Sequence, residues 1–204
     1  MKCVSAPAIF PNNDVNHHMN KLRAKRFAMR TEQNIVYAVA KDAPSLQALQ
    51  ERPALGLDKL KWLQRHDRES GNLYGMLPLV KDMPMALTDH IDRHPEKQLL
   101  RGKIGRAHSW VLALGEASGT QDGCRMLQRL PVVVFLKFPN AAWKLDGIDE
   151  AGVYPIRPKT EPWFLDKGRT HPVIRIIRKP LPIVTAFAIN AHASQRAILR
   201  CSDY

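Results

Sequence analysis

The chain has 204 residues, 45% of them hydrophobic and 25% charged, which suffices for one packed domain or for one domain with a smaller appendage. Its 31 lysines and arginines against 19 acidic residues give a formal net charge of +12, which favours a polyanionic partner, nucleic acid before an anionic membrane surface. Three widely spaced cysteines and the lack of a long apolar run argue against a disulfide framework, a cysteine-based zinc site, a membrane-spanning helix and a secretory signal, and favour an intracellular location, nuclear or cytoplasmic.

The first third of the chain predicts alternating strands and helices. After an apolar run at residues 8–10, Asn13 or Asp14 can cap a helix whose apolar positions recur every three or four residues. The residues on that face are Val15, Met19, Leu22 and Arg26. The elements expected next are a strand over residues 34–40, a short helix over 44–51 and a helix over 57–66.

Short apolar runs dominate the chain from residue 75 to residue 177. Gly, Pro and Asp interrupt them, a spacing that predicts antiparallel strands meandering into a small β-barrel. A strand over residues 181–185 and a helix over residues 186–199 then return to the α/β pattern. The apolar runs lie at residues 76–80, 85–87, 104–114, 132–138, 152–157 and 173–177.

Three segments carry sequence motifs. The first, residues 9–20, reads IFPNNDVNHHMN, with a pair of asparagines after an apolar run and a further asparagine, Asn20, at its end. The second reads LPLVKDMPMALTDHID at residues 77–92 and continues as LRGKIG at residues 100–105. The third, residues 182–195, reads PIVTAFAINAHASQ.

Taken in this order, the segments resemble the second RecA-like domain of superfamily-one DNA helicases of the Pif/RecD type, over most of residues 7–196. The family has Thr-Asn at the position of Asn12-Asn13, Gly at Asp82 and Asn at His90 and Arg101. In the third segment the matching residues are Pro182, Ala186, Phe187, Ala188, Ile189, His192, Ser194 and Gln195. The departures are Asn190, Ala193 and Arg196, which replace Thr, Lys and Gly.

The resemblance implies an α/β fold. Residues 1–100 would form part of a RecA-like domain, residues 101–180 an inserted antiparallel β-barrel of the Src-homology-three type, and residues 181–204 the returning strand and helix. It also implies that polar and cationic side chains contact the phosphates of single-stranded DNA, which positions a strand without reading its bases. Those residues are Asn13, Thr88, Arg101, Lys103, His192 and Ser194, with Gln195 and Arg196 near the nucleotide.

The resemblance does not extend to the ATP-binding half of such an enzyme. The phosphate-binding loop Gly-x-x-x-x-Gly-Lys-Ser/Thr does not occur in the sequence, and Asp149-Glu150 matches the magnesium-binding pair in letters only. Arg196 blocks the close backbone approach that Gly allows at that position. ATP and Mg²⁺ are therefore cofactors of the parent family that we expect not to bind this chain alone, and no catalytic residue or metal ligand is assigned.

Three interpretations remain open at this stage. The first is that the chain is the DNA-gripping part of a helicase whose ATPase half is encoded elsewhere, for example in a separate chain, or has been lost. The second is a non-enzymatic basic nucleic-acid-binding module. The third is a decayed helicase remnant of a mobile element. The basic run over residues 21–30 is either a DNA-contacting or a solvated helix face. The four tryptophans are either core residues or platforms for bases: Trp62, Trp110, Trp143 and Trp163.

Overall fold

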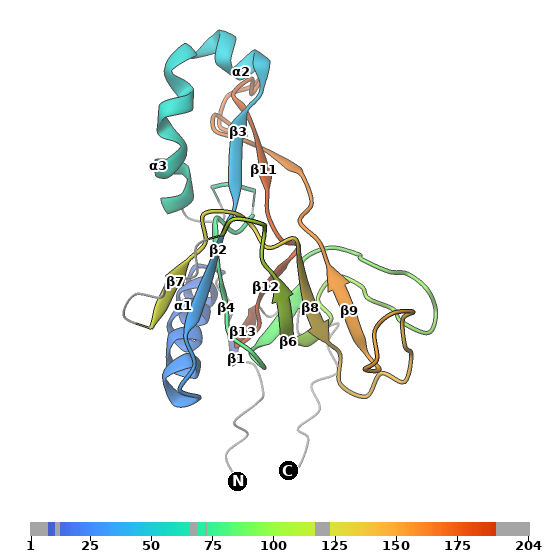
Figure 1. Ribbon diagram of the computed structural model, residues 1–204. Coiled ribbons are helices and arrows are strands. Elements are labelled where there is room, and N and C mark those ends of the chain that lie inside the picture. The colour runs from blue at the N-terminus through green and yellow to red at the C-terminus, as the bar shows by residue number, and fades with distance from the viewer. Residues whose placement is uncertain (1–7, 11–12, 66–68, 72, 117–122, 191–204) are drawn as a thin grey trace.

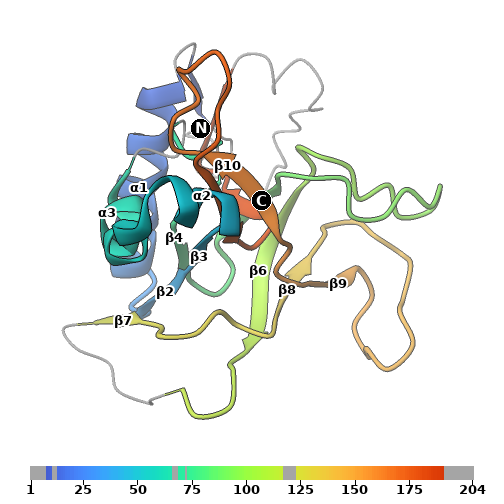
Figure 2. The same ribbon diagram turned by 90° about the horizontal axis from the view of Figure 1, so that it is seen from above.

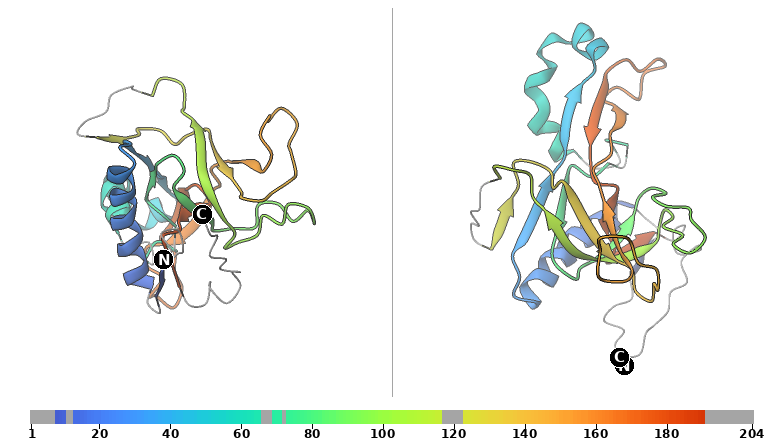
Figure 3. Two further views of the ribbon diagram at one scale, coloured as in Figure 1. Left: turned by 90° about the horizontal axis from the view of Figure 1, so that it is seen from below. Right: turned by 45° about the vertical axis from the view of Figure 1, so that its right-hand side comes forward.

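The computed structural model describes residues 8–10, 13–65, 69–71, 73–116 and 123–190 (Figure 1). Within these ranges strands predominate and helices are few. A smaller lobe, which carries α2, α3, β3 and β11, stands above a larger main body (Figure 3, right). Seen from above, α1 and α3 lie on one side of the molecule, and β6, β8 and β9 lie on the other (Figure 2).

The largest sheet of the main body has five strands, and neighbouring strands run antiparallel. Its central strands come from the apolar runs that the sequence analysis identified, because a run of β-branched and aromatic residues suits a pleated, half-buried surface. In spatial order the strands are β12 (Ile183–Thr185), β5 (Pro84–Leu87), β6 (Ile104–Val111), β8 (Val133–Lys137) and β9 (Val153–Ile156).

A second sheet of the main body has three strands. Strand β2 (Ile35–Val39) lies in its centre, antiparallel to β4 (Met76–Leu79) and parallel to β7 (Cys124–Met126). The predicted strand over residues 34–40 is thus confirmed, whereas β7 was not predicted. Its three residues, Cys-Arg-Met, form too short and too polar a run to be detected from the sequence.

The predicted barrel is not confirmed, because the strands of the described residues form no closed barrel. The five-stranded sheet ends with β12 on one side and β9 on the other. The physical reason lies in β11 (Arg175–Lys179), which pairs with β3 (Lys41–Pro44) from the first quarter of the chain and is thereby drawn into a separate sheet. The division of the chain at residues 100 and 180 stays a prediction.

The lobe is built around the sheet β10-β11-β3, with β10 (Glu161–Phe164) antiparallel to β11. Helix α2 (Leu46–Glu51) follows β3 and begins where the Ser45 hydroxyl accepts a hydrogen bond from the Ala48 backbone N–H at 3.1 Å. A 3₁₀ turn (Pro53–Asp58) and helix α3 (Lys59–Gln64) come next, in place of the single helix predicted over residues 57–66. Strands β3 and β10 were not predicted.

Helix α1 (Asn13–Arg30) is confirmed, but the face predicted to be apolar is wrong. Val15 is 44% exposed, and the buried positions are Asn20, Ala24 and Ala28. These three share one helix face at a spacing of four residues, and the small alanines let the helix backbone approach the strands it covers. Helix α1 lies against β1 (Ala8–Phe10), β12 and β13 (Ala188–Asn190).

The helix predicted over residues 186–199 is wrong at its start. Residues 188–190 form β13, which pairs in parallel with β1, in the register Ala8 to Ala188 and Phe10 to Asn190. Residues 191–199 lie outside the described residues. The run Ala-Phe-Ala-Ile suits a buried helix and a buried strand equally, and the pairing with β1 decides for the strand.

Candidate nucleic-acid interface

The second and third motif segments meet in the five-stranded sheet. Strand β12 pairs with β5, which places Ile183 opposite Leu87 and Thr185 opposite Met85. At one end of this pairing the Thr88 backbone N–H donates to the Pro182 carbonyl at 3.0 Å. The two segments, which lie about ninety residues apart in the sequence, are therefore held in a fixed register by backbone hydrogen bonds.

The first and third motif segments meet through Asn20. Its amide is 3% exposed and forms two hydrogen bonds to the backbone of Ala188: the side-chain N–H donates to the carbonyl at 2.9 Å, and the side-chain oxygen accepts from the N–H at 2.8 Å. Beside it, the Arg23 guanidinium donates to the Phe187 carbonyl at 2.9 Å. Asn20, which matches the family motif, thus holds β13 against α1 and does not face a ligand.

The parallel pair β1 and β13 has both carboxyl ends at one edge, and α1 begins three residues after Phe10, the last residue of β1. In α/β proteins ligands bind beyond the carboxyl ends of parallel strands, where a helix N-terminus favours an anion. Asn13 is the first residue of α1, although its side chain is outside the description. His192, Ser194, Gln195 and Arg196 follow β13 in the chain and lie outside the described residues.

The loop between β5 and β6 begins and ends at one place. The Gly102 N–H donates to the Leu87 carbonyl at 2.8 Å, and the Leu87 N–H donates to the Lys103 carbonyl at 3.0 Å. Thr88 and Arg101, the next residues inward on the two sides, are therefore neighbours at the neck of the loop. The Arg101 side chain is exposed, and its backbone N–H donates to the His90 ring at 3.3 Å.

Lys103 has a different environment from Arg101. It is partly buried, its ammonium lies 5.6 Å from the centre of the Phe138 ring, and it donates to the Lys97 carbonyl. Burial lowers the pKa of Lys103 because it disfavours the charged form. Lys103 therefore holds the loop closed from within, while Arg101 presents its charge to solvent.

Asp92 organises the interior of the same loop. Its carboxylate accepts from the His94 N–H at 2.9 Å, from the Lys97 ammonium at 2.9 Å and from the Tyr154 hydroxyl at 3.3 Å. The His94 N–H, followed by Lys97, holds the pKa of Asp92 below its usual value. Sequence reasoning missed this structural role of Asp92. The position of Asp92 at the end of the second motif segment was the signal that could have indicated it.

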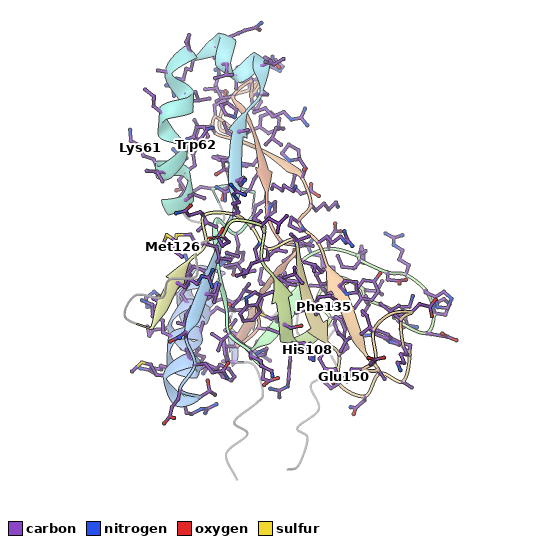
Figure 4. The ribbon with its side chains drawn as sticks, in the orientation of Figure 1. Lys61, Trp62, His108, Met126, Phe135 and Glu150 are labelled. Carbon is purple, nitrogen blue, oxygen red and sulfur yellow. The ribbon has the colours of Figure 1, made fainter. Side chains whose placement is uncertain are left out.

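The tryptophans divide into two groups. Trp62 and Trp163 are each 2% exposed and pack edge to face with ring centres 6.2 Å apart inside the lobe, so neither can stack on a base in this fold. In Figure 4, Trp62 is marked on α3 in the lobe. Trp110 and Trp143 are half-buried and pack against the core of the main body. The core interpretation therefore holds for Trp62 and Trp163, and the choice between core residue and base platform stays open for Trp110 and Trp143.

The described part of the chain offers no cluster of three or more His, Cys, Asp or Glu side chains that could hold a metal ion. His17, one of the adjacent pair on α1, lies 2.8 Å from the Tyr74 hydroxyl. His108 of β6 and Glu150, both labelled in Figure 4, lie 2.9 Å apart. The Lys137 ammonium lies 2.7 Å from the other carboxylate oxygen of Glu150. In the ranges that the structure describes, no helix is long and apolar enough to cross a membrane.

Comparison with known proteins gives a structural likeness. No protein-family model and no curated protein match the chain. The Pif1 helicase from Candida albicans is similar in structure, with a TM-score of 0.55 and 13% identity over 98% of this chain. The fold is helicase-like. The chain covers 39% of the length of that protein.

Two Bacteroides structures are less similar to this chain. The Bacteroides Pif1 bound to single-stranded DNA has a TM-score of 0.48 and 13% identity, over 96% of this chain and 34% of that one. The Bacteroides Pif1 in complex with ADP-AlF₄ has a TM-score of 0.48 and 12% identity, over 95% and 33%. At 12–13% identity, structural similarity shows a likeness of fold alone. That likeness rests on the Candida protein.

One departure from the family motif has a structural explanation in this helicase-like fold. Asp82 follows β4 and takes a φ of +64°, in the left-handed region that Gly tolerates best. The motif that the second segment resembles has Gly at this position, and Gly adopts such a φ without strain. Asp is one of the few other residues that adopt this conformation at modest cost, because its short side chain bonds locally.

Proposed function

We propose that the chain is a C-terminal part of an ATP-dependent 5′-to-3′ DNA helicase, and that it supplies single-stranded-DNA-binding and translocation contacts of that enzyme. ATP and Mg²⁺ would act on the parent enzyme's ATPase domain, in a separate chain or another part of the protein. On this proposal the chain alone binds single-stranded DNA and does not hydrolyse ATP.

One observation carries the proposal: the described parts of the three motif segments, which lie far apart in the sequence, are in contact. Asn20 of the first segment bonds to Ala188 of the third, and β5 of the second pairs with β12 of the third. Segments that matched the helicase motifs only by chance would have no reason to be in contact. The helicase-like fold and the net charge of +12 support the same function.

The DNA contacts would lie at two places in the main body. Arg101 and Thr88 at the neck of the β5–β6 loop would provide a cation and a hydroxyl to phosphate oxygens. The residues after β13, with His192 and Ser194, would provide further donors at the edge where β1 and β13 end. Lys103 would act by holding the loop in shape.

The test is binding of an oligothymidylate to the purified chain at several salt concentrations. Arg101→Gln should weaken binding and lower the slope of log K against log salt by about 0.7, the value for one phosphate contact on a single strand. Lys144→Gln, an exposed lysine in the loop between β8 and β9, is the matched control and should leave the slope unchanged. No binding at low salt, or equal slopes for both variants, would contradict the proposal.

A binding module without a motor is the second candidate. Ala193 and Arg196 replace the Lys and Gly of the family motif, which removes a phosphate cation and a close backbone approach. A nucleotide assay separates the two candidates. When the chain is combined with an ATPase domain of a Pif/RecD-type helicase, DNA-stimulated hydrolysis that falls on Arg101→Gln supports the first. DNA binding without such stimulation supports the second.

A further inference from the structure

The sheet of the lobe has two unlike faces. Because side chains alternate along a strand, Asp42, Trp163 and Arg178 point to one face, where α2 and α3 cover them. The other face is open. Phe164, Arg175 and Lys179 on it are exposed, as is Lys41, and Ile177 is half-buried.

The strand register arranges the open face in rows. Arg175 lies opposite Phe164 at one end, and Ile177 lies between Pro162 and Ala43 in the middle. At the other end Lys179 lies directly opposite Lys41. An apolar strip that includes an aromatic ring is thus flanked by cations at both ends.

The cations of the open face have no acidic partner in the described part of the chain. Among the residues that the structure describes, Lys41, Arg175 and Lys179 take part in no ion pair, whereas the neighbouring Lys159 is paired with Asp89 and Glu161. Like charges directly opposite on neighbouring strands destabilise a sheet. The Lys179–Lys41 pair therefore destabilises the lobe. A polyanion bound to this face would relieve the repulsion between the two lysines.

We propose that the open face of the β10-β11-β3 sheet is a second binding surface for single-stranded DNA. Phe164 would stack on a base, as aromatic side chains do in sequence-tolerant binding of single strands. Lys41, Arg175 and Lys179 would contact phosphates. A single ring with one half-buried isoleucine is too small an apolar area for a membrane surface, and a polyanion with stackable rings fits both features at once.

The polypeptide chain connects the open face directly to the edge of the main body where β1 and β13 end. Strand β11 leads through residues 180–182 into β12 and then β13, so one stretch of backbone runs from the lobe down to the edge of β1 and β13 (Figure 1). From Lys179 to Asn190 an extended chain spans at most about 40 Å. The proposal rests on the proposed function in that both surfaces take the same single strand.

The first experiment measures the salt dependence of oligothymidylate binding, with about 16 nucleotides, to the full chain. The variant Arg175→Gln/Lys179→Gln should lower the slope of log K against log salt by about 1.4, twice the value for one contact. The control Lys81→Gln/Lys144→Gln removes two exposed lysines from loops of the main body and should lower it by less than half as much. Equal losses in the two double variants would overturn the proposal.

The second experiment locates the base. An oligothymidylate that carries 5-iodouracil should crosslink to the peptide containing Phe164, and Phe164→Ala should weaken binding about fivefold or more. Leu114→Ala, which truncates a side chain that is 93% exposed, is the control and should not weaken binding. Polyglutamate should compete only weakly. If it competes as well as DNA and Phe164→Ala has no effect, the surface binds acidic protein and the proposal fails.

The two proposals fail in distinguishable ways. If Arg101→Gln weakens DNA binding and the Arg175/Lys179 variant does not, the lobe surface is wrong and the proposed function stands. If the lobe variant weakens binding and Arg101→Gln does not, the lobe binds DNA but the motif site fails. All substituted side chains are exposed, so each variant should fold. Thermal unfolding of each variant checks this.

Discussion

The main body and the lobe are stabilised in different ways. Among the residues that the structure describes, the core of the main body has twenty buried residues, nearly all aliphatic, which come from α1, from both of its larger sheets and from the loops between them. In the same ranges the core of the lobe has six, Ala48, Leu55, Trp62, Trp163, Ile174 and Ile176. A small core gains little free energy from apolar burial, so the lobe depends more on its few specific contacts.

The specific contact of the lobe is the buried ion pair of Arg178 and Asp42. The two side chains are 0% and 1% exposed, and the guanidinium forms two hydrogen bonds to the carboxylate at 2.7 Å each. Its remaining N–H groups donate to the Ser70 hydroxyl and to the carbonyls of Leu73 and Trp62. One side chain thereby joins β3, α3, the segment after α3 and β11, while its charge lies over the Trp163 ring.

The largest effect that we expect comes from removing this contact. Arg178→Ala leaves Asp42 buried and unpaired and should cost about 3–5 kcal/mol of stability. Hydrogen exchange followed by mass spectrometry should show the loss in β3 and α2 first, with β6 and β8 still protected. Equal loss of protection in β6 and β8 would show that the lobe and the main body unfold as one unit.

An exposed ion pair of the lobe serves as the control. Arg169 lies 3.0 Å from Glu51 and 3.1 Å from Asp166, and its side chain is 50% exposed. Arg169→Ala should therefore cost less than about 1 kcal/mol. A similar cost for both arginines would mean that burial does not decide the value of these pairs.

The second effect concerns Asn20 in the main body. Asn20→Ala leaves the buried N–H and carbonyl of Ala188 without these partners and should cost about 1–3 kcal/mol, seen as a lower midpoint of thermal unfolding. Asn20→Asp keeps the acceptor but loses the donor and buries a carboxylate beside the Ala188 carbonyl, so it should cost at least as much at neutral pH. Lys25→Ala, on the exposed face of α1, should leave the midpoint unchanged. If Asn20→Ala also leaves the midpoint unchanged, the two hydrogen bonds from Asn20 to β13 do not contribute to stability.

Sequence reasoning predicted the main body better than the lobe. Strands β2, β4, β5, β6 and β8 are apolar runs whose burial follows from their own composition. Strand β3 reads Lys-Asp-Ala-Pro, and no local rule makes it a strand. Asp42 is buried only because Arg178, 136 residues away, pairs with it. A contact of that range is invisible to periodicity.

The candidate site was predicted unevenly for the same reason. The neighbourhood of Thr88 and Arg101 follows from the resemblance, because both lie in the second motif segment. The partial burial of Lys103 could not be predicted, since it depends on a contact with the Phe138 ring 35 residues away. Likewise the predicted face of α1 relied on apolar spacing, whereas the buried position Asn20 is polar and satisfied by β13.

A third, smaller effect follows the pH. The pKa of Asp92 is lowered in the folded protein from a usual value of 3.8. A depressed carboxyl pKa adds stability above the unfolded value, which is lost as the pH falls through the folded value. Stability should therefore decline below about pH 4, and Asp92→Asn should flatten that decline in acid unfolding curves. Asp146→Asn, an exposed residue of the loop before β9, is the control. An unchanged acid slope in Asp92→Asn would contradict this role.

The smallest effect has the opposite sign and separates the two faces of one strand. Arg178 points into the lobe, and the next residue, Lys179, points outward opposite Lys41. Lys179→Glu replaces a like-charge pair by an opposite-charge pair and should raise stability by about 0.2–1 kcal/mol, measured by urea unfolding. The same change should weaken binding of single-stranded DNA. A residue whose replacement stabilises the fold while it weakens binding is kept for the ligand, whereas a loss of stability would mean that Lys179, like Arg178, serves the fold.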